Sequence, residues 1–148
     1  MVTEFVLATA NPDKAREISV ILGDSVRLLA RPDEVGEVDE TGATLLENAR
    51  LKARAVAQAS GIPAIADDTG LEADALEGRP GVHSSRYSGP HATYDDNVAK
   101  LLADLESVEG REARAARFRT VAIVCWPDGR ERPRTQQETP CRTSLPYR

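Results

Sequence analysis

The chain has 148 residues and a formal net charge of −5; 41% of its residues are hydrophobic, 29% are charged and only 4% are aromatic. This length suits one globular domain whose core is built from small aliphatic residues, and the negative charge argues against nucleic acid or an anionic membrane as the main partner. No stretch approaches the roughly 20 apolar residues of a membrane span, and the N-terminus lacks the pattern of a signal peptide. Cys125 and Cys141 lack metal-ligand spacing, which is typical of reduced thiols in a cytoplasmic protein.

The first predicted strand covers residues 5–8, and a helix over residues 12–22 follows it directly. Asn11 is a good N-cap, Pro12 fits the first helical position and Gly23 ends the helix. The expected apolar face consists of Ala15, Ile18, Ile21 and Leu22. The free N–H groups at a helix N-terminus attract anions, and Lys14 adds a mobile positive charge. An ordinary capped helix with a surface lysine explains the same pattern.

An acidic loop at residues 33–40 follows a second predicted strand at 26–29. Its five carboxylates either form a solvated loop or supply one or two ligands to a cation site. Thr44 and Glu47 then form a capping-box pattern that opens a long helix, which Gly61 ends. The apolar stripe of this helix contains Leu45, Leu46, Ala49, Ala53, Val56 and Ala57. Its other positions carry Glu47, Asn48, Arg50, Lys52 and Arg54, and most of these five are expected to form solvent-facing pairs.

A short apolar run at residues 63–66 stops at two adjacent carboxylates, Asp67 and Asp68. Side chains alternate across a strand, so these two carboxylates are predicted to point to opposite sides. Burying a carboxylate without a partner costs several kcal/mol. A divalent cation with oxygen ligands would explain the pair, and so would an Asx turn with a solvated second aspartate.

The rest of the chain contains a predicted strand at 71–76, a polar segment at 82–89, a helix capped by Thr93 and a strong strand at 118–126. Strands alternating with helices indicate an α/β fold, a mixed twisted sheet flanked by helices. Ligands in such folds bind at the carboxyl ends of strands, so Thr9 and Asp68 are expected to face one cleft. A turn at 127–129 should begin a hairpin, but residues 130–148 carry three prolines and almost no apolar period and are predicted to be a disordered tail. The predicted domain therefore covers residues 1–129.

Five segments in this order resemble the inosine triphosphate pyrophosphatase family, also called non-canonical purine nucleoside triphosphate pyrophosphatases. They are Leu-Ala-Thr-Ala-Asn-Pro-Asp-Lys-Ala-Arg-Glu17, Glu-Thr-Gly-Ala-Thr-Leu-Leu-Glu-Asn-Ala49, Ala-Ile-Ala-Asp-Asp-Thr-Gly-Leu71, Pro-Gly-Val-His-Ser-Ser-Arg-Tyr-Ser-Gly89 and Ala-Arg-Phe118. Each segment alone is a weak signal, but five with family-like spacing over residues 4–128 are specific.

The resemblance implies a Mg²⁺-dependent enzyme, usually a homodimer, that hydrolyses ITP, dITP and XTP to the monophosphate and pyrophosphate and so cleans the nucleotide pool. It implies that Asp68 is the general base and a metal ligand. It implies Asp39 as the second metal carboxylate, with Glu40 as a substitute. The residues implied to bind substrate are Thr9, Ala10, Asn11, Pro12, Asp13, Lys14 and Thr69.

The family's later segments, which the resemblance implies contact the purine base and further phosphate oxygens, are not matched after Gly129. The sequence therefore predicts weak activity or none. The alternatives are a Maf-like pyrophosphatase of similar architecture and a catalytically silent nucleotide-binding remnant.

Overall fold

A computed structural model of the chain describes residues 3–137. The strands are β1 (Thr3–Leu7), β2 (Val26–Leu29), β3 (Ala64–Ala73), β4 (Pro80–Gly81), β5 (Ala116–Cys125) and β6 (Glu131–Gln137), and the helices are α1 (Pro12–Leu22), α2 (Leu45–Ser60) and α3 (Tyr94–Asp104). The described residues form two compact units, the first made of residues 3–68 and 121–134 and the second of residues 69–120 and 135–137. No helix among the described residues is long and apolar enough to cross a membrane.

The strands form one sheet in the order β2-β1-β3-β5-β6, and β4 pairs with β3. β1 is parallel to both β2 and β3, whereas β4 runs antiparallel to β3. The predicted mixed α/β fold is therefore confirmed. The sequence predicted an apolar run at residues 63–66 and a separate strand at 71–76, whereas the structure has one continuous strand of ten residues that includes Gly70. Ladder hydrogen bonds with neighbouring strands outweigh the local preference of a glycine for a turn.

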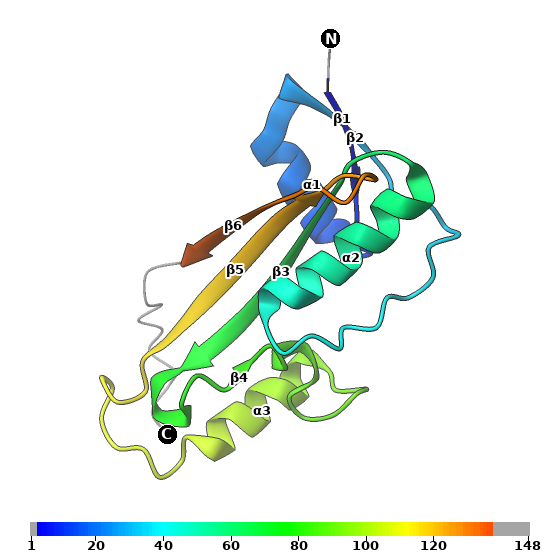
Figure 1. Ribbon diagram of the computed structural model, residues 1–148. Helices are drawn as coiled ribbons and strands as arrows, with labels where there is room; N and C mark the ends of the chain where they lie inside the picture. The colour runs from blue at the N-terminus through cyan, green and yellow to red at the C-terminus, as the bar shows by residue number, and fades with distance from the viewer. Residues whose placement is uncertain (1–2, 138–148) are drawn as a thin grey trace. The chain divides into compact units, whose positions relative to one another are not determined.

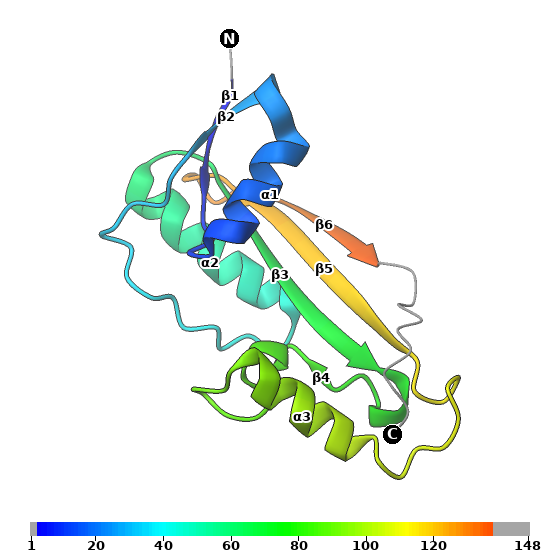
Figure 2. The same cartoon turned by 180° about the vertical axis from the view of Figure 1, so that it is seen from behind.

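In the first unit, α2 and α1 cover opposite faces of the sheet (Figures 1 and 2). The apolar stripe of α2 is buried except for Leu46, which is partly buried. Ala49, Ala53, Val56 and Ala57 pack in one core cluster with residues from the sheet and its strand ends, namely Val6, Ala8, Ala64, Ala66, Ile123 and Cys125. Burial raises the pKa of the Cys125 thiol. The α1 helix buries none of its side chains completely. Ile21, expected on its apolar face, is 73% exposed, because the helix rests on the sheet through the half-buried Ala15, Ile18 and Leu22.

The second unit has a small core of its own, made of Ala73, Leu76, Leu101 and Leu105. Thr93 caps α3, as the sequence predicted, and it forms a complete capping box with Asp96. Tyr87 donates a hydrogen bond to Asp104, and the Lys100 ammonium lies 3.3 Å from the same carboxylate. These contacts attach α3 to the segment that precedes it.

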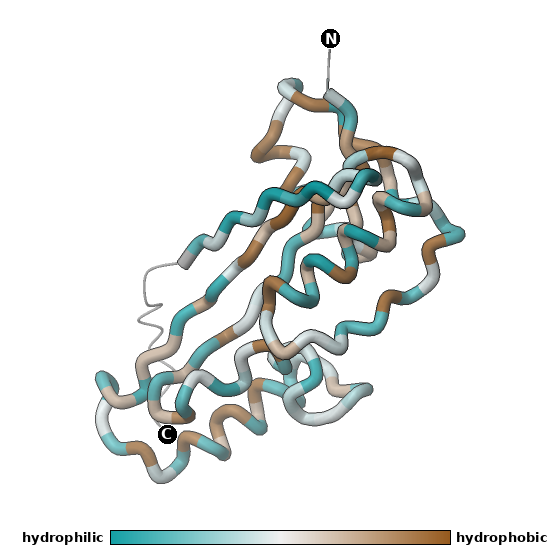
Figure 3. Tube along the Cα trace, viewed as in Figure 1, coloured by the Kyte–Doolittle hydropathy of each residue, from teal (hydrophilic) through white to brown (hydrophobic). Residues whose placement is uncertain are grey.

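The prediction of a structureless tail was wrong for residues 131–137, which form β6 beside β5. The backbone N–H of Trp126 donates to the carbonyl of Arg130 at 2.9 Å and closes the turn at Asp128 and Gly129. Figure 3 shows that β6 is hydrophilic along most of its length. A polar strand that contains a proline is acceptable at the edge of a sheet, where one side needs no partner. The rest of the predicted tail lies outside the described residues.

Candidate active site

The turn between β1 and α1 carries the predicted anion-binding segment. The side chain of Asn11 accepts a hydrogen bond from the Asp13 N–H at 2.9 Å and caps the helix, with Pro12 in the first turn. The Thr9 hydroxyl accepts from the Asn11 N–H at 3.1 Å. Lys14 extends from the first turn of α1, and its ammonium lies 2.7 Å from an Asp67 carboxylate oxygen. Ala10 and Asp13 are exposed beside it, so residues 9–14 form one contiguous cap at the N-terminal end of α1.

Asp67 and Asp68 face opposite sides of β3, as predicted from the alternation of a strand. Asp67 contacts Lys14 on the α1 side, whereas Asp68 contacts Lys52 of α2, with 3.7 Å between the ammonium and the carboxylate. Lys14 and Asp68 thus each have a different charged partner, and the expectation that Thr9 and Asp68 face one cleft stays a prediction.

The two faces nevertheless meet at one strand edge. The last residue pair between β1 and β3 is Leu7 with Ile65, so Asp67 and Asp68 lie beyond the end of β1. Their Cα atoms are separated by a single peptide, about 3.8 Å. Lys14 and Lys52 therefore pair with consecutive residues of the same strand, one on each of its sides.

On the α2 side, two carboxylates share one ammonium. Lys52 lies 2.9 Å from a Glu40 oxygen and 3.7 Å from an Asp68 oxygen, and its side chain is only 18% exposed. We refer to Glu40, Lys52 and Asp68 as the α2-face cluster. Of the two acidic residues that the sequence left as alternatives, Glu40 lies in this cluster, while Asp39 is exposed and accepts a hydrogen bond from Thr41 through its backbone carbonyl.

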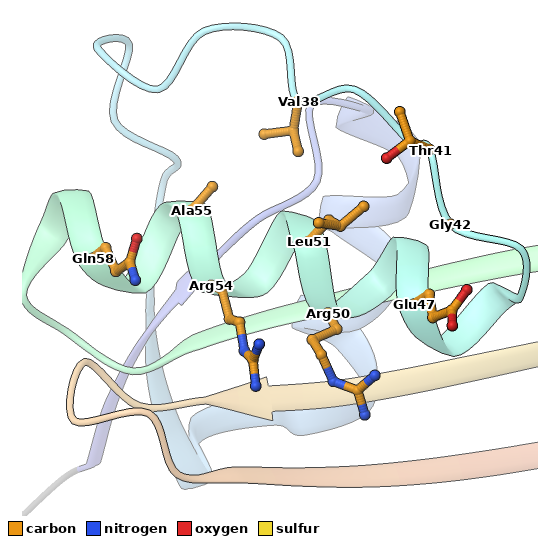
Figure 4. Close-up of a pocket in the computed structure, with 9 residues that line it drawn as sticks. All are labelled: Val38, Thr41, Gly42, Glu47, Arg50, Leu51, Arg54, Ala55 and Gln58. Carbon is orange, nitrogen blue, oxygen red and sulfur yellow. The ribbon is translucent and has the colours of Figure 1, made fainter.

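Thr69 begins the second unit, and its hydroxyl lies 2.9 Å from that of Thr120. A shallow hollow of about 560 Å³ lies along α2. Figure 4 shows Val38 of the acidic loop and Thr41, which follows the loop, above the helix, with Arg50 and Arg54 extending from the helix toward the strands. None of the predicted site residues lines this hollow. Because the predicted site residues do not line the hollow, we place the candidate site at their charged contacts, the α2-face cluster and the Lys14–Asp67 pair.

Sequence reasoning missed Lys52, which it treated as one of several solvent-facing charges of α2. The available signal was its position four residues after Asn48, next to the buried stripe of the helix. Arg50 was missed in the same way: it binds Glu131 of β6 through three contacts of 2.8 to 3.1 Å. The partners of Lys52 and Arg50 lie outside α2, and the periodicity of a helix does not predict contacts with other segments.

In a comparison with known proteins, the family model described as the Ham1 family matches residues 5–142 of this chain. The chain is 49% identical over 122 residues to a dITP/XTP pyrophosphatase of Methylococcus capsulatus, an alignment that covers 81% of this chain and 60% of the relative. It is 53% identical over 135 residues to a dITP/XTP pyrophosphatase of Nitratidesulfovibrio vulgaris, covering 84% of this chain and 64% of the relative.

The structure is similar to that of a HAM1 protein from Coxiella burnetii, with a TM-score of 0.81 and 36% identity. That match covers 92% of this chain and 70% of the other. The chain spans less than two thirds of the length of the two curated relatives above. The match of the family model over most of the chain and the likeness of the fold lead to one conclusion: this chain belongs to the Ham1 family.

Proposed function

We propose that this protein hydrolyses non-canonical purine nucleoside triphosphates, with dITP, ITP and XTP as substrates, to the monophosphate and pyrophosphate. The observation that carries the proposal is the α2-face cluster, in which the Glu40 and Asp68 carboxylates share the Lys52 ammonium. The Lys14–Asp67 pair adds a second ammonium on the other side of β3. The names of the relatives, which are dITP/XTP pyrophosphatases, support the choice of substrate.

The donor set fits a hard divalent cation. Glu40 and Asp68 supply carboxylate oxygens that already share one positive group, Lys52. Among residues 3–137 no cluster of three or more acidic, histidine or cysteine side chains is placed to hold a metal. A site with two carboxylates is typical of Mg²⁺, which takes its remaining ligands from water and from substrate phosphates. When bound, Mg²⁺ would neutralise phosphate charge and lower the pKa of nearby water.

Each protein group has a role that its position allows. Asp68 accepts the proton of the attacking water, whose oxygen forms a bond to the α-phosphorus. The bond from the α-phosphorus to the bridging oxygen breaks, and pyrophosphate leaves with that oxygen. The N-terminus of α1 and Lys14 bind the phosphates through N–H groups and positive charge. Positioning and charge stabilisation dominate such reactions.

The test is release of pyrophosphate from dITP, ITP, XTP and ATP with and without Mg²⁺, using Asp68→Asn as the control. Loss of a general base costs about 10²- to 10⁴-fold in rate, so the variant should lose pyrophosphate release by at least 100-fold. Nucleotide-induced thermal stabilisation without any release would indicate the silent remnant. Equal turnover of the wild type and the variant would refute the proposal.

We further propose that the protein acts in the cytoplasm as a homodimer, which the family resemblance supports. Sedimentation velocity of the purified chain at micromolar concentration tests the oligomeric state. A single species with the mass of one chain would contradict it.

A further inference from the structure

Residues 42–44, which connect the acidic loop to α2, are held at the start of the helix by consecutive hydrogen bonds. The Gly42 N–H donates to the Asn48 side-chain oxygen at 2.7 Å. The N–H groups of Ala43 and Thr44 both donate to one Glu47 oxygen, at 2.6 and 3.2 Å. The bonds to Glu47 belong to an ordinary capping box. Asn48, the next residue of the helix, accepts a further bond from Gly42, which precedes Ala43 in the chain.

Asn48 is fully buried, which is unusual for this residue type on a helix. Its Oδ1 must face the Gly42 N–H, because a donor requires an acceptor. Its Nδ2 has no hydrogen-bond partner among the described residues. Holding the loop is thus the polar contact that Asn48 provides here. The amide does so without a third negative charge beside Glu40 and Asp68.

Gly42 allows this close approach because it has no side chain. A Cβ at position 42 would lie 2.6 Å from the Glu47 Cβ and 2.7 Å from the Asn48 Oδ1, both far inside normal contact distance. Any other residue would push the loop away from α2. The sequence therefore combines a buried acceptor with the one residue that can reach it.

Glu40 lies two residues before Gly42, and the turn between them is tightened by the bond from the Thr41 N–H to the Asp39 carbonyl, 3.1 Å. Asn48 and Lys52 are four residues apart and so lie on the same side of α2. Asn48 fixes the loop backbone, and Lys52 meets the Glu40 carboxylate from the next turn at 2.9 Å.

We propose that Asn48 is a positioning residue that holds Gly42 and thereby keeps the Glu40 carboxylate beside Asp68 for a divalent cation. This inference rests on the proposed function for its purpose. Because Asn48 is fully buried, we assign it an indirect role through Glu40 and no contact with substrate. Residues that orient metal ligands typically change metal affinity 10- to 100-fold when they are replaced.

The experiment uses the full chain and Mn²⁺ as the probe. Affinity for Mn²⁺ is measured by electron paramagnetic resonance without nucleotide, and amide hydrogen exchange is measured by NMR. Asn48→Ala should raise the Mn²⁺ dissociation constant at least tenfold and accelerate exchange of the Gly42 amide at least tenfold. The Gly61 amide, which bonds to Ala57 at the other end of α2, should keep its protection. Asn48→Asp keeps the acceptor and should restore protection of Gly42.

A matched control is Asn97→Ala, because the Asn97 side chain also accepts a backbone N–H, from Ser88 at 2.8 Å, on another helix. It should leave Mn²⁺ affinity unchanged. Should Asn48→Ala fail to fold, Gly42→Ala, which keeps Asn48, must weaken Mn²⁺ binding equally. In the wild type, the Gly42 amide must exchange at least 100-fold more slowly than the same amide does in the urea-unfolded chain.

Unchanged Mn²⁺ affinity in folded Asn48→Ala, or rapid exchange of Gly42 in the wild type, would overturn the inference. So would a wild-type chain that binds no Mn²⁺ at millimolar concentration. If the wild type releases no pyrophosphate from dITP but its Mn²⁺ affinity depends on Asn48, the proposed function fails while the positioning role stands.

Discussion

The contact between α2 and β6 yields a quantitative prediction about stability. The Glu131 carboxylate accepts three hydrogen bonds from Arg50, at 2.8 to 3.1 Å, and one from Arg54 at 3.1 Å. Glu131 and Arg50 are each about one quarter exposed. Fully exposed ion pairs contribute about 0 to 1 kcal/mol, while hydrogen bonds to charged groups contribute about 1.5 to 3 kcal/mol. Because this pair lies between these cases, Glu131→Gln should lower the free energy of unfolding by about 1 to 2 kcal/mol at pH 7.

The effect should depend on pH in a definite direction. The hydrogen bond from Arg50 is the main cause that lowers the pKa of Glu131 in the folded protein. A carboxyl whose folded pKa is depressed stabilises the fold above its unfolded pKa, about 4.3 for glutamate, and this contribution is lost as the pH falls through the folded pKa. The difference between wild type and Glu131→Gln should therefore be full at pH 7 and shrink below about pH 4.

Urea unfolding followed by circular dichroism at pH 7, 5 and 3.5 measures this difference. Glu4→Gln is a suitable control, because Glu4 forms a mostly exposed pair with Arg27 at 3.0 Å and should change stability by less than about 0.5 kcal/mol. A Glu131→Gln variant as stable as the wild type at pH 7 would refute the reasoning. So would a difference that stays constant down to pH 3.5.

The remaining predictions concern substrate binding and the second unit. Lys14→Gln should raise KM for dITP about tenfold or more, because it removes a charge-assisted contact to phosphate. Arg16→Gln, which removes an exposed charge two residues away, should change KM less than threefold. Equal effects in steady-state assays would exclude a specific role for Lys14. Asp67→Asn removes the partner of the Lys14 ammonium, and we expect KM to change more than kcat; a selective loss of kcat would instead indicate that Asp67 takes part in the chemistry. The hydrogen bond from Tyr87 is the main cause that lowers the pKa of Asp104. Tyr87→Phe should therefore raise the pKa of Asp104 toward its usual range in an NMR titration. An unchanged Asp104 pKa would argue that the bond is absent in solution.

Much of the fold could be predicted because local signals and tertiary structure agree. The caps at Asn11, Thr44 and Thr93 mark the starts of α1, α2 and α3, and the apolar stripe of α2 identifies the face that is buried. The opposite orientation of Asp67 and Asp68 follows from strand geometry alone. These features depend on residues close together in the chain.

The features that sequence reasoning missed depend on partners far apart. β6 has no apolar alternation because it is an edge strand, and Glu131 gains its role from two arginines of α2 about 80 residues earlier. Lys52 looks like any other helix charge until the loop and β3 bring Glu40 and Asp68 to it. The alternation along β3 gives Asp67 and Asp68 different partners, Lys14 and Lys52, and the expected single cleft stays a prediction.

The central claim is that water attacks the α-phosphorus of a purine nucleoside triphosphate at Asp68. Hydrolysis of dITP in ¹⁸O-labelled water, followed by mass spectrometry of the products, tests it most directly. We predict one ¹⁸O atom in the monophosphate, none in the pyrophosphate, and no labelled product with Asp68→Asn. Label in pyrophosphate or orthophosphate, or the same labelled product from Asp68→Asn, would contradict the account.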